Sequence, residues 1–204
     1  MKKLIFHLIH GRQARYGDWI LTSTGRQLWP SDPRAGDFDV GEIAHNLSLV
    51  CRFTGSVAVA YPVSSHSVMV QEIIRDCGGS LVEQLQGLMH DAPESIISDI
   101  PAPIKRFLPD VVKAEKKIWK AMAEQFGVPE KMSPLVKAAD RISLITERRD
   151  LMPDSPHAWK GYDNVKPISS HVKIMSAKSA EKLFLERFHH LRSKMISQSA
   201  ECHP

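Results

Sequence analysis

A histidine and an aspartate stand side by side at His90 and Asp91, in a mostly apolar stretch that carries a second carboxylate, Glu94, three residues further on. Neighbouring residues of a helix are turned about 100° apart, yet both side chains can bend toward an ion held between helices. Two more polar residues, His66 and Asp140, interrupt apolar helical faces elsewhere in the chain. Imidazole nitrogens and carboxylate oxygens suit a divalent cation and leave coordination positions open for water and substrate. The sequence therefore predicts a metal site whose ligands are His66, His90, Asp91 and Asp140.

Each of these residues has a plainer interpretation when it is taken alone. A single histidine on an apolar face is more often a hydrogen-bonded core residue than a ligand, and His66 is open to that explanation. Asp140 has the alternative of an ion pair with Arg141 or Lys137. The joint pattern, with further acidic residues after His90, favours the metal site over these separate explanations.

The order His, His-Asp and then Asp resembles the HD-domain phosphohydrolase superfamily. After the adjacent pair, the segment with Glu94, Asp99 and Lys105 looks like the equivalent one in the deoxynucleotide-hydrolysing branch, which includes bacterial deoxynucleoside 5′-monophosphatases and phage deoxynucleoside triphosphohydrolases. This resemblance implies that Glu94 and Asp99 are catalytic or contact the substrate, and that Lys105 binds a phosphate. A solvated lysine is the plainer alternative for Lys105.

The resemblance extends upstream to Arg52, which precedes His66 much as an arginine precedes the first metal histidine in those enzymes. A guanidinium can grip a phosphate through two donors at once, although a salt bridge at a helix end would also explain Arg52. Phe53 follows where those enzymes have tryptophan, so we expect Phe53 in the substrate site and leave the sugar preference open. The likeness covers about residues 40–150.

These residue types favour hydrolysis at a phosphate. A divalent ion (cobalt, zinc, manganese, nickel, iron or magnesium) lowers the pKa of a bound water and offsets phosphate charge, while Arg52 and Lys105 add positive charge. Glu94 and Asp99 could orient the water or move its proton. Together with the resemblance, this chemistry implies a metal-dependent phosphohydrolase that cleaves the 5′ phosphate ester of deoxynucleotides by attack of metal-bound water. Similarity to the phage enzymes favours a triphosphohydrolase, converting dATP to deoxyadenosine and triphosphate, over a deoxynucleoside 5′-monophosphatase.

A non-catalytic module that binds nucleotide or nucleic acid is the main alternative. The complete ligand set argues against a decayed site, and no stripe of aromatic and basic residues of the kind that binds single strands is found. We therefore expect a small nucleotide rather than nucleic acid as the partner. A cyclic-dinucleotide phosphodiesterase or di-iron oxygenase of the same superfamily would need further histidines for a second metal. The resemblance also implies a homo-oligomer, a dimer or larger.

The composition is that of an ordinary globular protein. With 204 residues, 43% hydrophobic and 25% charged, and a net charge of +4, the chain is long enough for one core and short for two, so we expect a single domain over residues 1–204. Three scattered cysteines offer no disulfide framework, which favours the cytoplasm, or a host cytoplasm for a phage protein. His7 and His10 interrupt the N-terminal apolar run, so we expect no signal peptide there, and no run approaches the about 20 residues of a membrane span.

Helices are the elements that must position these residues. A short hairpin around Ser23-Thr24-Gly25 is the one predicted sheet, and Glu147-Arg148-Arg149-Asp150 is predicted to be a solvated, mutually paired helix face. Apolar residues at helical spacing predict six or seven helices in a compact all-α bundle of the HD type. The expected helices span about Asp39 to Gly55, Val63 to Gly78, Leu81 to Asp91, Val111 to Phe126, Ser133 to Leu151 and Ala180 to Leu191.

Overall fold

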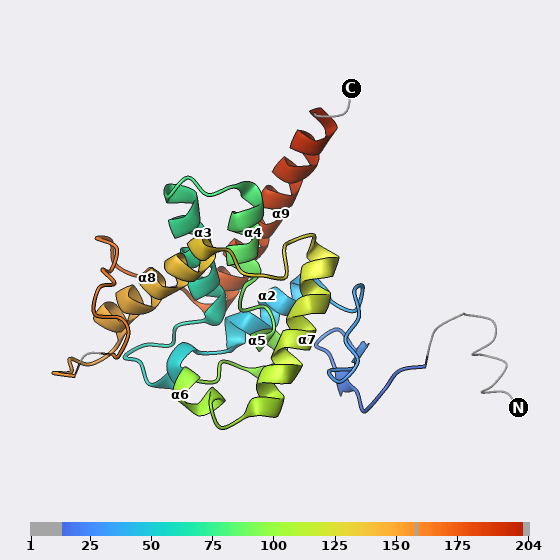
Figure 1. Cartoon of the computed structure of the whole chain (residues 1–204), viewed down its shortest axis with the longest axis horizontal. Coiled ribbons are helices and arrows are strands. Elements are labelled where there is room, and N and C mark those ends of the chain that lie inside the picture. The colour runs from blue at the N-terminus through green and yellow to red at the C-terminus, as the bar shows by residue number, and fades with distance from the viewer. Residues whose placement is uncertain (1–13, 158, 202–204) are drawn as a thin grey trace, which may run out of the picture.

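The protein is described by a computed structural model that covers residues 14–157 and 159–201. The N-terminal stretch with His7 and His10, and Cys202 near the other end, lie outside these residues. Helices make up most of the described chain, and a short hairpin precedes them (Figure 1). The predicted all-α bundle with an N-terminal hairpin is therefore confirmed.

The hairpin pairs β1 (Ile20–Leu21) with β2 (Gln27–Leu28) in antiparallel register. Its turn includes Gly25, whose φ of +82° is a conformation that residues with a Cβ rarely adopt. This is the only sheet in the part of the chain that the structure describes. The short hairpin predicted around Ser23-Thr24-Gly25 is therefore confirmed.

The first described helix, α2 (Val40–Leu49), begins as predicted, because the Asp39 side chain caps it by accepting from the backbone N–H of Glu42 at 3.1 Å. It ends earlier than the predicted Gly55. The backbone N–H of Arg52 donates to the carbonyl of Tyr61 at 2.9 Å, and the next residues form a 3-10 turn, Arg52–Gly55. Tertiary hydrogen bonds override the helical pattern here.

Helix α3 (Val63–Asp76) lies at the centre of the bundle and packs against α2, α4, α8 and α9. Its first half is buried on all sides, including three serines that flank His66, namely Ser64, Ser65 and Ser67. Small side chains allow neighbouring helices to approach this segment closely. His66 is therefore placed deep in the protein, with no exposed surface.

Helix α4 (Leu81–Met89) starts with a capping box between Ser80 and Glu83 and ends at His90. It packs closely on α3, where the Ile74 side chain lies against Gly87 and would have to shift to admit a Cβ at that position. This close approach of α3 and α4 brings His66 and His90 within reach of each other.

The remaining helices complete the bundle. Short α5 begins directly after Pro93, and Pro109 and Pro134 occupy the first turns of the two long helices α7 and α8, where the missing N–H is not needed. Helix α9 packs against α2, α3 and α4, and its C-terminal end projects beyond the other helices (Figure 1). The bounds are α5 (Glu94–Ile97), α6 (Ala102–Lys105), α7 (Pro109–Phe126), α8 (Pro134–Leu151) and α9 (Ala177–Glu201).

The apolar core forms around α2, α4, α7 and α9, where Leu47, Leu85, Met122 and Phe184 have no exposed surface. A smaller cluster joins α3 to α8 through Ile74 and its neighbours. Within the described residues, no helix is both long enough and apolar enough to cross a bilayer.

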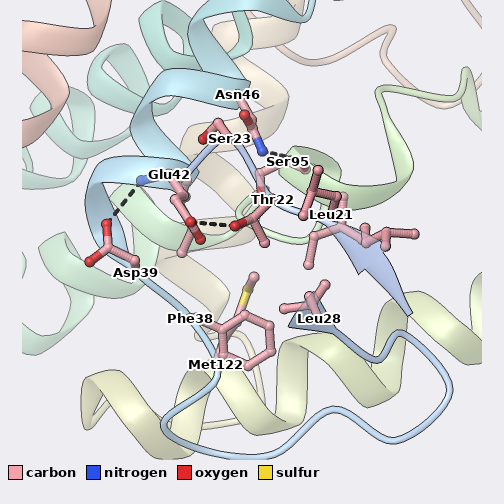
Figure 2. A pocket seen from close by; sticks show the side chains of 13 residues that line it. Leu21, Thr22, Ser23, Leu28, Phe38, Asp39, Glu42, Asn46, Ser95 and Met122 are labelled. Carbon is pink, nitrogen blue, oxygen red and sulfur yellow. Dashed lines mark hydrogen bonds between the residues drawn. The ribbon is translucent and has the colours of Figure 1, made fainter. Parts of the chain in front are cut away.

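A cavity of about 140 Å³ lies between the hairpin, α2, α5 and α7, and Figure 2 shows Glu42 at its wall. The Glu42 carboxylate is buried and accepts hydrogen bonds from the hydroxyls of Thr22 (2.6 Å) and Thr24, and from Arg26 (2.5 Å). Burial raises the pKa of Glu42, but these donors outweigh it and lower the pKa to about 2. Glu42 thus fastens the hairpin to α2.

Replacing Glu42 with glutamine should reduce stability in a pH-dependent way. The folded pKa lies below the ordinary value of 4.5, so the stabilisation is present above pH 4.5 and is lost as the pH falls toward 2. We expect Glu42→Gln to cost about 1–3 kcal/mol at pH 7. Urea unfolding of both proteins between pH 7 and pH 2.5 measures the difference, and a gap that does not shrink in acid would contradict this account.

Candidate metal centre

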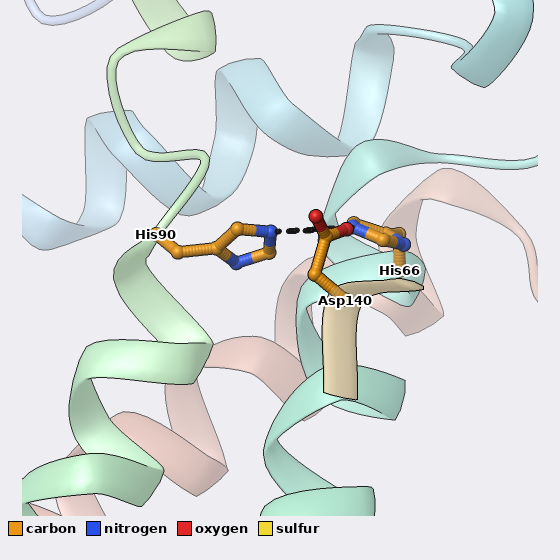
Figure 3. Close-up of side chains that lie close together, drawn as sticks. All are labelled: His66, His90 and Asp140. Atoms are coloured by element: carbon orange, nitrogen blue, oxygen red, sulfur yellow. Dashed lines mark hydrogen bonds and ion pairs between the residues drawn. The ribbon is translucent and has the colours of Figure 1, made fainter. Parts of the chain in front are cut away.

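His66 from α3, His90 from the end of α4 and Asp140 from α8 point toward one another (Figure 3). His66 Nε2 lies 3.3 Å from His90 Nε2 and 3.3 Å from Asp140 Oδ1, and His90 Nε2 lies 3.7 Å from the same oxygen. A cation about 2.1 Å from each ligand sets adjacent ligands roughly 3.0–3.4 Å apart. These three residues could therefore hold a metal ion, as predicted for them.

Asp91 adds a second carboxylate to the group. Its Oδ2 lies 3.3 Å from Nε2 of His66 and 3.3 Å from Nε2 of His90. All four predicted ligands therefore meet at one place, although they come from three helical segments. Their separations fit the ligand spacing of a small divalent cation.

The protons on the two imidazoles can be assigned from their partners. His66 Nδ1 lies 2.7 Å from Glu147 Oε1, and His90 Nδ1 lies 2.7 Å from the carbonyl oxygen of Gly87. A carbonyl oxygen only accepts, and so does an ionised carboxylate, so both rings donate through Nδ1. A neutral ring then turns the lone pair of Nε2 toward the cluster, which is the arrangement that metal ligation needs.

The carboxylates of the cluster favour positive charge on its two imidazoles. Burial lowers the pKa of both imidazoles, but carboxylates outweigh it: Glu147, Asp140 and Asp91 raise the pKa of His66, and Asp91 and Asp140 raise that of His90. The carboxyls of Asp91 and Asp140 have pKa values below their usual range, because the imidazoles overcome the effect of burial. A divalent cation supplies the same positive charge and displaces the extra protons.

The cluster is buried at one end and open at the other. The side chains of His66 and Glu147 are fully buried, whereas that of Asp140 is 42% exposed. Of the ligand side chains, that of Asp140 therefore reaches solvent. Open positions are what distinguish catalytic metal sites from closed structural ones.

Glu94 is a buried carboxyl beside this cluster. Burial, followed by the negative charges of Asp91 and Asp99, raises the pKa of Glu94 to about 9. Its Oε2 has no hydrogen-bond partner, and its Oε1 lies 3.4 Å from Nζ of Lys105. Lys105 also contacts Glu115 at 2.8 Å. Lys105 is therefore not a freely solvated lysine, and the raised pKa of Glu94 favours its protonated form.

Arg52 lies inside the protein, where its guanidinium joins several carboxylates. Nη1 is 3.4 Å from Asp99 Oδ2 and 3.9 Å from Asp91 Oδ2, while Nη2 is 3.2 Å from Glu147 Oε2. Asp99 Oδ2 also accepts from the backbone N–H of Phe53 at 3.2 Å. The structure thus brings Arg52 and Asp99 to the cluster as an internal ion pair, and their contact with a substrate stays a prediction.

Phe53 has a left-handed backbone, with φ of +56°, an uncommon conformation for a bulky residue that often marks functional segments. Its ring centroid lies 5.2 Å from the guanidinium carbon of Arg52 and 6.2 Å from the ring centroid of Trp159. Arg148 covers the Trp159 ring at 4.8 Å. An aromatic surface, defined as Phe53 and Trp159, therefore lies next to Arg52.

Glu147 was predicted to be part of a solvated, mutually paired helix face, and this prediction was wrong. Its side chain has no exposed surface and contacts His66 and Arg52. Asp140, Ser143 and Glu147 follow one another at spacings of three and four residues, which places them on one face of α8. That spacing from a predicted ligand was the signal that could have identified Glu147.

The fold and the ligand cluster define the class: an all-α protein with a buried histidine–aspartate centre that could hold a metal. No family model matches the sequence. The chain is 35% identical over 174 residues to the uncharacterized protein YfdR of Escherichia coli, covering 85% of this chain and 95% of YfdR. It is 31% identical over 142 residues to the uncharacterized protein RCAP_rcc00048 of Rhodobacter capsulatus, covering 65% of this chain and 72% of that protein. The chain therefore belongs to the same protein family as YfdR.

Proposed function

We propose that this protein is a metal-dependent phosphohydrolase of the HD type that releases the phosphate groups of a deoxynucleotide. The observation that carries the proposal is the convergence of four ligand atoms, from His66, His90, Asp91 and Asp140, in which every pair that includes a histidine is 3.3–3.7 Å apart. A buried, protonated carboxyl at Glu94 accompanies them. Together they would provide a cation site and a proton donor, both of which promote phosphate ester hydrolysis.

A divalent cation held by these ligands lowers the pKa of a bound water and offsets the charge of a phosphate. The chain's own residues supply the remaining functions. Glu94 donates its proton to the departing 5′ oxygen of the sugar as the bond from that oxygen to the α-phosphorus breaks and a water oxygen bonds to phosphorus. The Glu94 carboxylate then takes up the proton that the attacking water loses, which restores the acid. Lys105, whose side chain is 22% exposed, contributes positive charge at the phosphate.

The nucleoside part of the substrate would occupy the aromatic surface. Arg52 links the two regions, since its guanidinium contacts both Asp91 in the cluster and the ring of Phe53. Aromatic rings stack with bases of any kind at about 1–3 kcal/mol per base. We assign Phe53 to substrate binding on this ground, with a deoxynucleoside triphosphate such as dATP as the favoured substrate and a 5′-monophosphate as the alternative.

The proposal is tested by incubating the purified protein, after metal analysis, with a panel of deoxynucleoside mono- and triphosphates and Co²⁺, Mn²⁺, Mg²⁺ or Zn²⁺. Release of deoxyadenosine with intact tripolyphosphate supports the triphosphohydrolase, and release of single phosphates from monophosphates supports the alternative. Absence of hydrolysis with every nucleotide and metal, in a folded protein, would contradict both. Nucleotide binding without turnover would favour a non-catalytic module.

A further inference from the structure

Glu147 is a buried acid that the proposed chemistry does not use. It lies on the far side of the His66 ring from the ligand cluster: its Oε1 is 2.7 Å from Nδ1, whereas Nε2 faces His90 and Asp140. Glu147 therefore cannot bind the same ion as His66. Its contact acts on the ring itself.

Two neighbours fix the orientation of the Glu147 carboxylate. Arg52 Nη2 donates to Oε2 at 3.2 Å, and the hydroxyl of Ser143 donates to Oε1 at 3.3 Å. Ser143 Oγ also lies 3.0 Å from Nδ1 of His66. With one oxygen held by an arginine, which can only donate, the other oxygen is left to accept from His66.

We propose that Glu147 is a positioning residue that keeps the proton of His66 on Nδ1 and thereby presents Nε2 to the metal. This inference deepens the proposed function, because it rests on the same metal site, but it does not depend on turnover of any substrate. Carboxylates that accept from the second nitrogen of a histidine ligand fix its tautomer and raise its basicity. Glu147 therefore contributes to metal affinity without touching the metal.

The two histidines are held differently, which makes the role specific to His66. His90 donates to the backbone carbonyl of Gly87 within its own helical segment, so its tautomer does not depend on any side chain. His66 depends on a side chain 81 residues away in sequence. A single substitution can therefore change the tautomer of one ligand and leave the other unchanged.

Glu147→Gln provides the direct test. Since Arg52 only donates, the amide oxygen of the new side chain must turn toward Arg52, which leaves its NH₂ group facing His66. Nδ1 must then accept, and the proton moves to Nε2, where it blocks the metal. We expect Zn²⁺ affinity, measured by chelator competition on the full chain, to fall by about 10–100-fold. Wild-type affinity in Glu147→Gln would overturn the proposal.

Glu42→Gln is the matched control, because Glu42 is also a buried carboxylate paired with an arginine but lies at the hairpin, away from His66. It should keep wild-type Zn²⁺ affinity. An equal loss of affinity in both variants would show that neutralising any buried carboxylate disturbs the fold. That result would overturn the specific role of Glu147.

Nitrogen-15 NMR of the histidines reads the tautomer directly and remains informative if Glu147→Gln fails to fold. In the Zn²⁺-loaded wild type we expect His66 to carry its proton on Nδ1 and to bind through Nε2. Ser143→Ala removes the two longer contacts of Ser143 Oγ, to His66 Nδ1 and Glu147 Oε1, and keeps the 2.7 Å contact between His66 and Glu147, so it should keep this tautomer. Ligation through Nδ1 in the wild type, or a tautomer change in Ser143→Ala, would overturn the proposal. A protein that binds Zn²⁺ as expected but hydrolyses no nucleotide would instead contradict the proposed function alone.

Discussion

His66→Ala is expected to lose both the bound metal and phosphate release. His66 Nε2 is the most central of the ligand atoms, at 3.3 Å from His90 Nε2, Asp91 Oδ2 and Asp140 Oδ1. Its removal deletes a ligand and leaves Glu147 as a buried carboxylate without its imidazole. We expect metal affinity to drop by more than about 100-fold and hydrolysis by at least about 10³-fold, since a metal contributes several kcal/mol of charge stabilisation.

Because His66 is fully buried, the variant must be accompanied by one that spares the core. Asp140→Ala changes a side chain that is 42% exposed, so it should fold normally and still lose metal. His171→Ala is the matched control, because this histidine is 83% exposed and pairs with Asp150 rather than with the cluster. Metal content is measured by elemental analysis and activity by phosphate release. Full metal content in folded Asp140→Ala would show that the cluster is not the metal site.

The candidate ligands could be predicted from the sequence because local signals mark the helices that carry them. Ser80 and Glu83 form a capping box at the start of α4, and the apolar stripe through Leu85 and Leu88 ends next to His90. The stripe of α3 is about as regular, whereas that of α8 is weaker. In such segments the backbone follows local preferences, so a polar residue within an apolar stripe can be recognised.

The partners of Arg52 could not be predicted in this way. Its contacts to Asp99 and Glu147 join residues separated by 47 and 95 positions, and no local pattern reports such pairs. The early end of α2 has a similar cause, because the backbone N–H of Arg52 donates to the carbonyl of Tyr61. The left-handed residue Phe53 also makes a long-range hydrogen bond, from its backbone N–H to Asp99 Oδ2.

The burial of Glu147 shows a second limit. Four consecutive charged residues, Glu147 to Asp150, are typical of a solvated helix face. Helix α8 instead contacts the bundle through the face that carries Asp140, Ser143 and Glu147. The charged side chain of Glu147 therefore points inward and contacts His66. Which face of a charged helix is buried depends on the packing of other helices, and buried charges of this kind concentrate at functional sites.

Glu94 is the residue whose protonation should govern the pH dependence of hydrolysis. The carboxyl is buried, and burial together with Asp91 and Asp99 raises its pKa to about 9. A cation at the neighbouring cluster adds positive charge and lowers this value. An acid catalyst works only while protonated, so activity should be retained below the pKa of Glu94 and lost as the pH rises through it, at or below about pH 9.

Glu94→Gln should therefore reduce the turnover rate by about 10²–10⁴-fold. The residual rate should no longer decline at alkaline pH. Metal content should stay unchanged, because Glu94 is not one of the proposed ligands. Glu115→Gln is the matched control: Glu115 also contacts Lys105 Nζ, at 2.8 Å, so it reports the loss of a partner for Lys105 without the loss of the acid. Rates across pH 6–10, with metal analysis of each variant, measure these effects. A similar rate loss in both variants would assign the effect to Lys105, and an unchanged alkaline decline in Glu94→Gln would assign the proton to another group.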